Sequence, residues 1–302
     1  MTDQPDGRSH AGAPEADASG APAWDGVLFD LDDTLLDLRT AQRAAFTATV
    51  RRQWPGAQTA DPAVLEAGVA DFSPDVHGHY ERYVAGELTF AEQRLARVAD
   101  ALAAMGVPEA YLEPVERLWV EDYEAAMRAG WAAFPRTAEV LEGIRDSGRG
   151  IGVVTNNVEE YQRGKLAAIG LGWIDVVVGS DTAGAPKPAA APFLAGCAAL
   201  GSAPSRTLCV GDSLRHDVAG ARAAGLVPVW LHRAGVVDHG SAGEVGVERS
   251  TGAEEAAGAG RPADAAGPVD PAGPACPADP PRWDREQGCW RIPGLEALRA
   301  WL

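Results

Sequence analysis

Short apolar runs alternate with amphipathic segments over much of the chain, and one apolar run stands apart near its beginning. Short continuous apolar runs are typical of strands that are buried on both faces of a sheet. The apolar runs, with the polar residues that end them, lie at 26–30, 150–157, 174–181, 206–213 and 227–233. Helical periodicity fills the segments 136–148, 159–171, 187–201 and 215–226. This alternation predicts an α/β fold with a parallel sheet and right-handed crossovers.

A block of helical character, residues 38–130, separates the first apolar run from the others. Apolar residues such as Leu38 and Ala45 recur in it at helical spacing, and Thr89 with Glu92 has the spacing of a capping box. The block therefore predicts a second, smaller helical domain that is inserted into the α/β core directly after its first strand.

Two segments have no periodic pattern. Residues 1–23 and 236–288 consist largely of Gly, Ala, Pro, Asp and Glu, a composition typical of disorder. The last segment, 289–302, is expected to add a short edge strand and a closing helix. The predicted division is a disordered tail at 1–23, an α/β core at 24–37, 131–235 and 289–302, a helical domain at 38–130, and a disordered insertion at 236–288.

The chain of 302 residues carries a formal net charge of −17. This acidic balance, without a basic stripe, argues against nucleic acid as a partner. An anionic substrate would need a local cation. No apolar run reaches the length of a membrane span, and the first residues lack the apolar stretch of a secretory signal. The four cysteines have no metal-type spacing. A reduced, cytoplasmic protein that does not bind membranes is expected.

Lysine is rare in this chain. The 26 basic residues comprise 24 Arg and two Lys, Lys165 and Lys187. Where arginine otherwise supplies positive charge, a lysine indicates a place that needs a compact ammonium group rather than a planar guanidinium. Chance is the alternative interpretation, and it suffices for Lys165.

The stretch GVLFDLDDTLLD, residues 26–37, joins the first apolar run to a cluster of acids. Open parallel sheets place their chemistry at the carboxyl ends of the strands, which is where Asp30 falls. Asp30, Asp32 and Asp33 repel one another and need a cation or a proton to be tolerated together. The alternative is a loop of turn-forming Asp and Thr residues. The other segments of the chain are needed to choose between these two interpretations.

Further segments bring polar residues to the same predicted edge. The second run ends in Thr155 and Asn156, and the fourth ends in Asp212, with Asp217 one helical turn further on. Lys187 follows the third run, at the start of a helix. Each residue alone has an ordinary explanation, such as a strand end, a helix N-terminal acid or a solvated lysine. Their convergence on one edge predicts a phosphoryl-transfer enzyme.

Together these motifs resemble those of the haloacid dehalogenase-like (HAD) superfamily of hydrolases. The matching residues are Asp30-Leu31-Asp32-Asp33-Thr34, Thr155-Asn156, Lys187-Pro188, and Gly211-Asp212-Ser213 with Asp217. They stand in the family's order, and the similarity covers the chain apart from its two low-complexity segments. The resemblance implies a Rossmann-like core, and the inserted helices resemble the family's type-1 cap. One departure is Asn157, which stands where many relatives have Gly; an Asn can still adopt a left-handed conformation in such a turn.

The resemblance also implies a mechanism. Asp30 would attack the phosphorus and form an aspartyl-phosphate. Asp32 would protonate the leaving oxygen and then accept a proton from the attacking water. Mg²⁺, held by Asp30, Asp212 and the backbone carbonyl of Asp32, would offset the repulsion between these acids and a phosphate dianion.

The remaining motif residues are implied to bind the phosphoryl group. Lys187 would add a point charge, and the Thr155 hydroxyl with the backbone N–H of Asn156 would hold the phosphoryl oxygens. Asp217 would orient metal-bound water or Lys187 without touching the substrate. For Asn156 the backbone is expected to matter more than the side chain.

The resemblance favours hydrolysis of a small phosphorylated metabolite. Dehalogenase members lack an acid at the position of Asp32, because a halide leaves without a proton, and phosphonate-cleaving members use a cap lysine, whereas residues 38–130 contain none. A phosphomutase of the same superfamily and a catalytically inactive phosphate-binding module stay open as alternatives. Candidate substrate contacts in the cap are His77, His79, Tyr80, Arg82, Tyr83, Arg94 and Arg97, although a solvated helix face with a buried Tyr explains most of them better.

Overall fold

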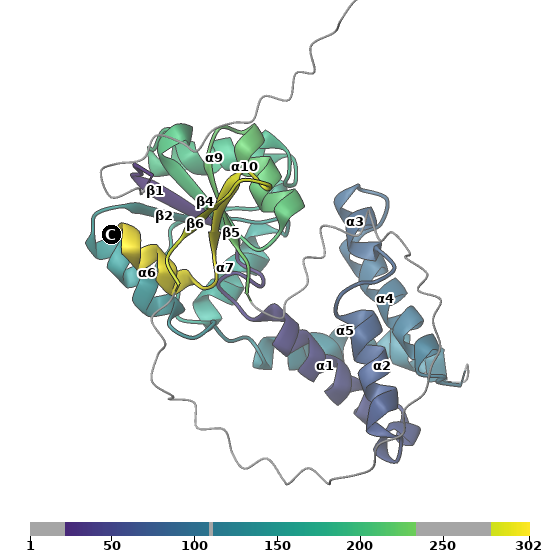
Figure 1. Ribbon diagram of the computed structural model, residues 1–302. Coiled ribbons are helices and arrows are strands. Elements are labelled where there is room, and N and C mark those ends of the chain that lie inside the picture. The colour runs from purple at the N-terminus through teal and green to yellow at the C-terminus, as the bar shows by residue number, and fades with distance from the viewer. Residues whose placement is uncertain (1–21, 109–110, 234–278) are drawn as a thin grey trace, which may run out of the picture.

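A seven-stranded sheet forms the centre of the computed structural model, which describes residues 22–108, 111–233 and 279–302. The strand order is β3-β2-β1-β4-β5-β7-β6, and all neighbours are parallel except β6 and β7 (Figure 1). The strands are β1 (Gly26–Phe29), β2 (Gly150–Val154), β3 (Val176–Val178), β4 (Thr207–Gly211), β5 (Val227–Leu231), β6 (Arg282–Asp284) and β7 (Cys289–Ile292). The predicted α/β fold with a parallel sheet is confirmed.

The side chains of strand β1 contribute to two apolar clusters, one on each face of the sheet. Val27 and Phe29 belong to the larger core cluster on one face, and Leu28 belongs to the cluster on the other face. None of the three is exposed to solvent. The alternation follows from strand geometry, since successive side chains point to opposite faces, and it explains why this strand reads as a continuous apolar run.

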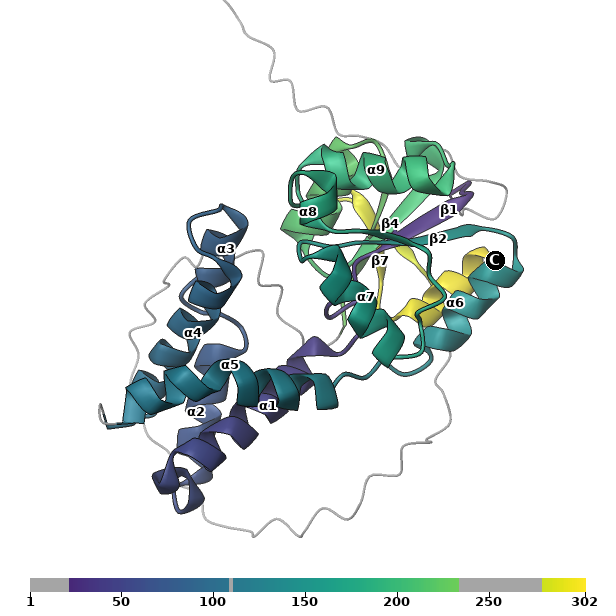
Figure 2. The same cartoon turned by 180° about the vertical axis from the view of Figure 1, so that it is seen from behind.

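Helices cover both faces of the sheet (Figures 1 and 2). Helices α6, α7 and η6 contribute apolar side chains to the cluster of Val27, and α9 and α10 contribute to the cluster of Leu28. These and the shorter helices of the core are α6 (Thr137–Asp146), α7 (Glu159–Ala168), α8 (Ser180–Ala183), α9 (Ala190–Leu200), η3 (Pro204–Arg206), η4 (Leu214–Ala219), α10 (Gly220–Ala223) and η6 (Leu295–Trp301).

A separate block of helices, the helical cap, follows β1 and lies beside the sheet (Figure 1). It consists of α1 (Leu38–Gln53), η1 (Pro55–Gln58), α2 (Pro62–Phe72), α3 (His79–Val84), α4 (Phe90–Ala104) and α5 (Leu112–Ala129). The cap has its own core, in which Phe46, Phe72, Trp119 and Tyr123 pack ring to ring. The predicted capping box of Thr89 at the start of α4 is confirmed.

Two chain segments connect the cap to the sheet, and they pair with each other. Leu36 and Ala133 form an antiparallel bridge. The N–H of Asp37 donates to the Ala132 carbonyl at 2.9 Å, and the N–H of Phe134 donates to the Leu35 carbonyl at 3.0 Å. The cap is therefore attached through a short paired ribbon next to the end of β1.

The C-terminal region differs from the prediction. Residues 279–288 belong to the segment expected to lack structure, yet they contain strand β6. Trp283 of this strand, which is partly buried, packs against the buried Trp290 of β7, with ring centroids 5.6 Å apart. This aromatic pair stabilises a strand that the composition of the segment does not predict. As a result β7 lies between β5 and β6 and is not the edge strand. The other low-complexity stretches, 1–21 and 234–278, lie outside the described residues.

Within the residues that the structure describes, no helix is both long enough and apolar enough to cross a membrane.

Candidate active site

The predicted site residues gather at the carboxyl edge of the sheet. Asp30 directly follows β1, Thr155 follows β2 and Asp212 follows β4. Asp30 and Thr155 are fixed by the sheet itself, because their N–H groups donate to the carbonyls of Val210 (2.9 Å) and Val178 (3.0 Å) on neighbouring strands. Parallel pairing thus brings residues from distant parts of the sequence to one edge.

Lys187 lies between two carboxylates at this edge. Its Nζ is 2.7 Å from Oδ1 of Asp30 and 2.7 Å from Oδ1 of Asp217, and the lysine is 3% exposed. Burial lowers the pKa of Lys187, but the carboxylates of Asp217 and Asp30 outweigh burial and hold its pKa above the ordinary value. The ammonium group therefore stays charged, and it places a buried positive charge beside Asp30.

The side chain of Asn156 holds the backbone of Lys187. Its Nδ2 donates to the Lys187 carbonyl at 3.0 Å, and its Oδ1 accepts from the Lys187 N–H at 2.6 Å. The expectation that Asn156 matters less through its side chain overlooked this contact. The neighbouring Asn157 does not adopt a left-handed conformation, unlike Asp33 and Arg136, so the turn does not require a glycine there.

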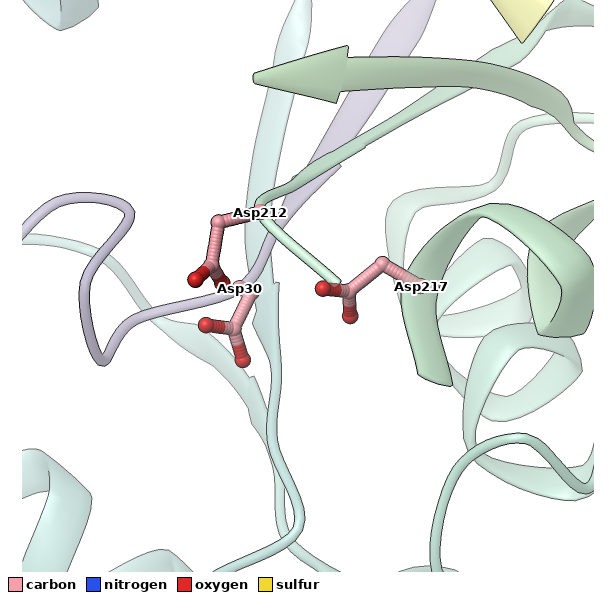
Figure 3. Close-up of side chains that lie close together, drawn as sticks. All are labelled: Asp30, Asp212 and Asp217. Carbon is pink, nitrogen blue, oxygen red and sulfur yellow. The ribbon is translucent and has the colours of Figure 1, made fainter. Parts of the chain in front are cut away.

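Asp30, Asp212 and Asp217 form a compact group of carboxylates. One oxygen of each lies within 4.8 Å of the others, and Figure 3 shows the three side chains turned toward one another. Burial raises the pKa of Asp30 to about 7, although Lys187 opposes the rise. Burial and the charges of Asp30 and Asp217 also raise the pKa of Asp212. The three acids outnumber the nearby cations, Lys187 and Arg39, and this surplus of negative charge fits a divalent cation held by oxygen ligands.

Asp217 reaches this group because Gly211 leaves room for it. Oδ2 of Asp217 accepts a hydrogen bond from the N–H of Ser213 at 3.1 Å, while Oδ1 binds Lys187. A Cβ atom at position 211 would lie 2.2 Å from Oδ2 and 2.6 Å from the Cβ of Asp217. No real structure tolerates such distances, so a glycine at the end of β4 is required for this arrangement.

Asp32 is bound by residues that sequence reasoning missed. Nζ of Lys165 lies 2.6 Å and 2.7 Å from the two Asp32 oxygens, and Nε2 of Gln162 donates to Oδ2 at 3.0 Å. Both partners come from α7 and are buried. The Asp32 side chain is therefore not among the three clustered carboxylates, and only its backbone carbonyl, as predicted, would serve a metal. The rarity of lysine could have pointed to Lys165, but the sequence analysis attributed that residue to chance.

The hydroxyl of Thr155 has a free proton. Its Oγ1 accepts hydrogen bonds from Nε2 of Gln162 at 2.7 Å and from the N–H of Asn157 at 3.3 Å. A hydroxyl that accepts twice keeps its own hydrogen for a third partner. The Thr155 hydroxyl can therefore donate a hydrogen bond at the carboxyl edge of the sheet.

Two arginines shape the loop that follows Asp32. Arg39 binds the carboxylate of Asp33 through Nε at 3.2 Å and lies 3.6 Å from Asp212. Burial raises the pKa of Asp33 to about 6, which Arg39 opposes. Arg233 donates to the backbone carbonyls of Asp33 and Thr34 and stacks on the ring of Phe134. Neither arginine belongs to a motif, so neither could be selected from the sequence.

Helix α3 of the cap also interacts with the core. The negative charge of Asp32, in addition to burial, raises the pKa of the Tyr80 phenol, and Lys187 and Asp30 are also within electrostatic range. Glu81 forms an ion pair with Arg215 and lies 3.3 Å from Nε2 of His216, both in η4 of the core. Tyr80 therefore faces the catalytic edge, and Glu81 fixes α3 against the core.

Most other candidates in the cap make contacts inside the cap. His77 and His79 bind Asp71 and Asp100, Arg82 binds Glu87, and Arg97 donates to the Phe72 carbonyl. Tyr83 packs between the rings of Tyr80 and Phe90. Arg94 binds Glu124 of α5 and lies 3.5 Å from the Tyr161 hydroxyl of the core helix α7. Of this set, Tyr80, Arg94 and Tyr83 reach the core, the last through a hydrogen bond with the side chain of Ser180 in α8.

Comparison with known proteins gives consistent matches. Residues 24–225 match the sequence model of a family described as haloacid dehalogenase-like hydrolase. The chain is 31% identical over 205 residues to a ribulose-1,5-bisphosphate 5-phosphatase of Halopiger xanaduensis, covering 67% of this chain and 82% of that protein. It is 30% identical over 230 residues to a phosphoserine phosphatase of Thermus thermophilus, covering 68% and 88%. The structure of YfnB from Bacillus subtilis superposes with a TM-score of 0.56 at 22% identity, covering 69% and 89%, a likeness of fold.

Proposed function

The chain belongs to the haloacid dehalogenase-like hydrolases, and we propose that it releases phosphate from a small phosphorylated metabolite through an aspartyl-phosphate on Asp30, with Mg²⁺ as cofactor. It is a hydrolase of the phosphatase kind, as are the phosphatases of Halopiger xanaduensis and Thermus thermophilus to which it is similar. The observation that carries the proposal is the position of Asp30, which directly follows the central strand and is bound to a buried lysine within a group of three carboxylates.

Asp30 is the proposed nucleophile. In the first step a bond forms between an Asp30 oxygen and phosphorus, and the bond from phosphorus to the leaving oxygen breaks. Lys187 and the Thr155 hydroxyl, with the Asn156 N–H, stabilise the charge that moves onto the phosphoryl oxygens. The contact between Asn156 and the Lys187 backbone keeps two of these groups at a fixed separation.

Asp32 is the proposed acid and base. It gives a proton to the leaving oxygen in the first step, and in the second step it accepts a proton from the water that attacks phosphorus. The bond between Asp30 and phosphorus then breaks, so that ester and water yield alcohol and phosphate. A halide would need no such proton, and Asp32 therefore supports phosphate esters as substrates.

Asp30, Asp212 and the backbone carbonyl of Asp32 are the proposed ligands of Mg²⁺. When bound, the ion would offset the repulsion between a phosphate dianion and the acidic edge. The surplus of negative charge at Asp30, Asp212 and Asp217 supports this assignment. Asp217 keeps Lys187 in place, since its two oxygens bind Lys187 and the Ser213 N–H.

Phosphate release from a panel of esters tests the proposal. The panel contains phosphoserine, ribulose bisphosphate, phosphoglycolate, sugar phosphates, nucleoside monophosphates and p-nitrophenyl phosphate, each with Mg²⁺ and with EDTA. We expect release from at least one ester, abolished by EDTA and lowered at least about 10⁴-fold by Asp30→Asn, because the nucleophile is lost. Isomerisation of a sugar phosphate without free phosphate would indicate a mutase. A folded wild type that binds phosphate without turnover would indicate a binding module.

A further inference from the structure

Both lysines of the chain are buried at the catalytic edge, and each binds a different aspartate. Lys187 binds Asp30, the proposed nucleophile, and Lys165 binds Asp32, the proposed acid and base. The function so far described gives Lys165 no role, although it is 2% exposed and contacts both oxygens of its partner.

We propose that Lys165 is a positioning residue for Asp32, and that Gln162 couples Asp32 to Thr155. This inference rests on the proposed function. The amide nitrogen of Gln162 lies 3.0 Å from Oδ2 of Asp32 and 2.7 Å from Oγ1 of Thr155. The acid–base group and the phosphoryl-binding hydroxyl are thereby held at a fixed separation by one turn of α7.

The hydrogen bonds to Asp32 assign separate tasks to its two oxygens. A carboxylate offers about four acceptor positions. Oδ2 accepts from both Lys165 and Gln162, whereas Oδ1 accepts from Lys165 alone. Oδ1 is therefore the oxygen with a free position that faces neither donor, and it is the atom that exchanges the proton with the leaving group and the water.

A purely structural role explains this pair poorly. A buried ion pair contributes little to stability compared with apolar side chains of similar volume. Lys165 is itself only 2% exposed, so its side chain lies in the protein interior. The ring of Tyr161 covers the ammonium group at 5.1 Å. A leucine or methionine would fit such surroundings, so the charge at Lys165 is explained by Asp32.

Leaving-group dependence tests the proposal. A poor leaving group, such as an alkoxide, needs the proton of Asp32, whereas p-nitrophenolate leaves without one. For Lys165→Met we expect kcat/KM to fall about 10²- to 10³-fold with the best alkyl phosphate of the panel and less than about tenfold with p-nitrophenyl phosphate. Lys165→Arg, which keeps the charge, should recover part of the loss. The matched control Arg163→Met, on the exposed side of the same helix, should leave both values within about twofold.

A double-mutant cycle separates positioning from structure. If Lys165 acts through Asp32, then Asp32→Asn with Lys165→Met should lie within about threefold of Asp32→Asn alone on the alkyl ester. The double variant has no unpaired buried charge, and Asp32→Asn leaves Lys165 without its carboxylate, so urea titration of both checks that they fold. The comparison between them does not require Lys165→Met alone to fold. Additive losses, or equal losses on both esters, would overturn the inference while an active wild type leaves the proposed function intact. A wild type inactive on every ester overturns both.

Discussion

The sheet edge and the helical cap carry charged side chains in different ways. At the sheet edge Asp30, Asp212 and Asp217 surround a single buried lysine, and acids outnumber bases. In the cap, pairs such as Arg43 with Glu66 and Arg82 with Glu87 match one to one, and about half of each side chain is exposed. Exposed pairs contribute little to stability, whereas buried unbalanced charges are costly and persist where chemistry needs them.

The largest effect should come from removing the positive charge that Asp30 and Asp217 share. Lys187→Met leaves Asp30 and Asp217 without their cation, and we expect the free energy of unfolding at neutral pH to fall by about 3–5 kcal/mol. In the cap, Arg82→Met is the matched change and should cost less than about 1 kcal/mol. Urea titration of both variants measures the two losses in the free energy of unfolding. Similar losses in the two variants would remove the distinction between sheet edge and cap.

A smaller effect is expected from Gly211→Ala. The added Cβ would displace Asp217 from Lys187 and from the Ser213 N–H, because it would lie 2.2 Å from Oδ2. Overpacking of this kind costs about 1–3 kcal/mol, and phosphate release should fall more than the melting temperature suggests, since the displaced carboxylate holds Lys187. The control is Gly164→Ala on α7, where a Cβ meets no atom within 4 Å. Unchanged activity in Gly211→Ala would show that Asp217 is dispensable.

The pH dependence of stability should sharpen the comparison further, with the smallest effect. The pKa values of Asp30, about 7, and Asp33, about 6, lie above the ordinary value for Asp, 3.8. Between the ordinary and the raised pKa the folded chain binds more protons than the unfolded chain. These groups therefore lower the stability of the metal-free protein as the pH rises from about 4 to 7.

Mg²⁺ should counteract this loss, because it binds ionised carboxylates. We expect it to raise the melting temperature by several degrees at pH 7.5 and by less at pH 5. Differential scanning calorimetry at both pH values, with Mg²⁺ and with EDTA, measures the effect. Asp30→Asn is the control, and it should flatten the pH dependence of the metal-free protein. A shift by Mg²⁺ that does not change with pH would place the ion away from Asp30.

Many residues at the carboxyl edge of the sheet could be predicted from the sequence, because parallel strands place the residues that follow them by a simple rule. A parallel sheet delivers the residue after each strand to one side, so Asp30, Thr155 and Asp212 could be grouped from their positions alone. Lys187 was selected by the rarity of lysine and by its position after the third apolar run, whereas the buried contacts of Asn156 required coordinates.

Residues on helices were harder to assign. Gln162 and Lys165 are three positions apart and share one face of α7, but periodicity does not tell which neighbour that face meets. The same limit applies to α3, where Tyr80 faces the catalytic edge while His79 binds Asp100 inside the cap. Strand β6 was missed for another reason, since one tryptophan pair outweighs a composition that is typical of disorder.

The scarcity of lysine gives this protein two built-in spectroscopic reporters. A chain grown with ¹⁵N-lysine would carry label at Lys165 and Lys187 only. Each ammonium group touches a different aspartate, so one NMR signal would follow Asp30 and the other Asp32. The two halves of the reaction could then be observed separately in the intact protein, without any label on the substrate.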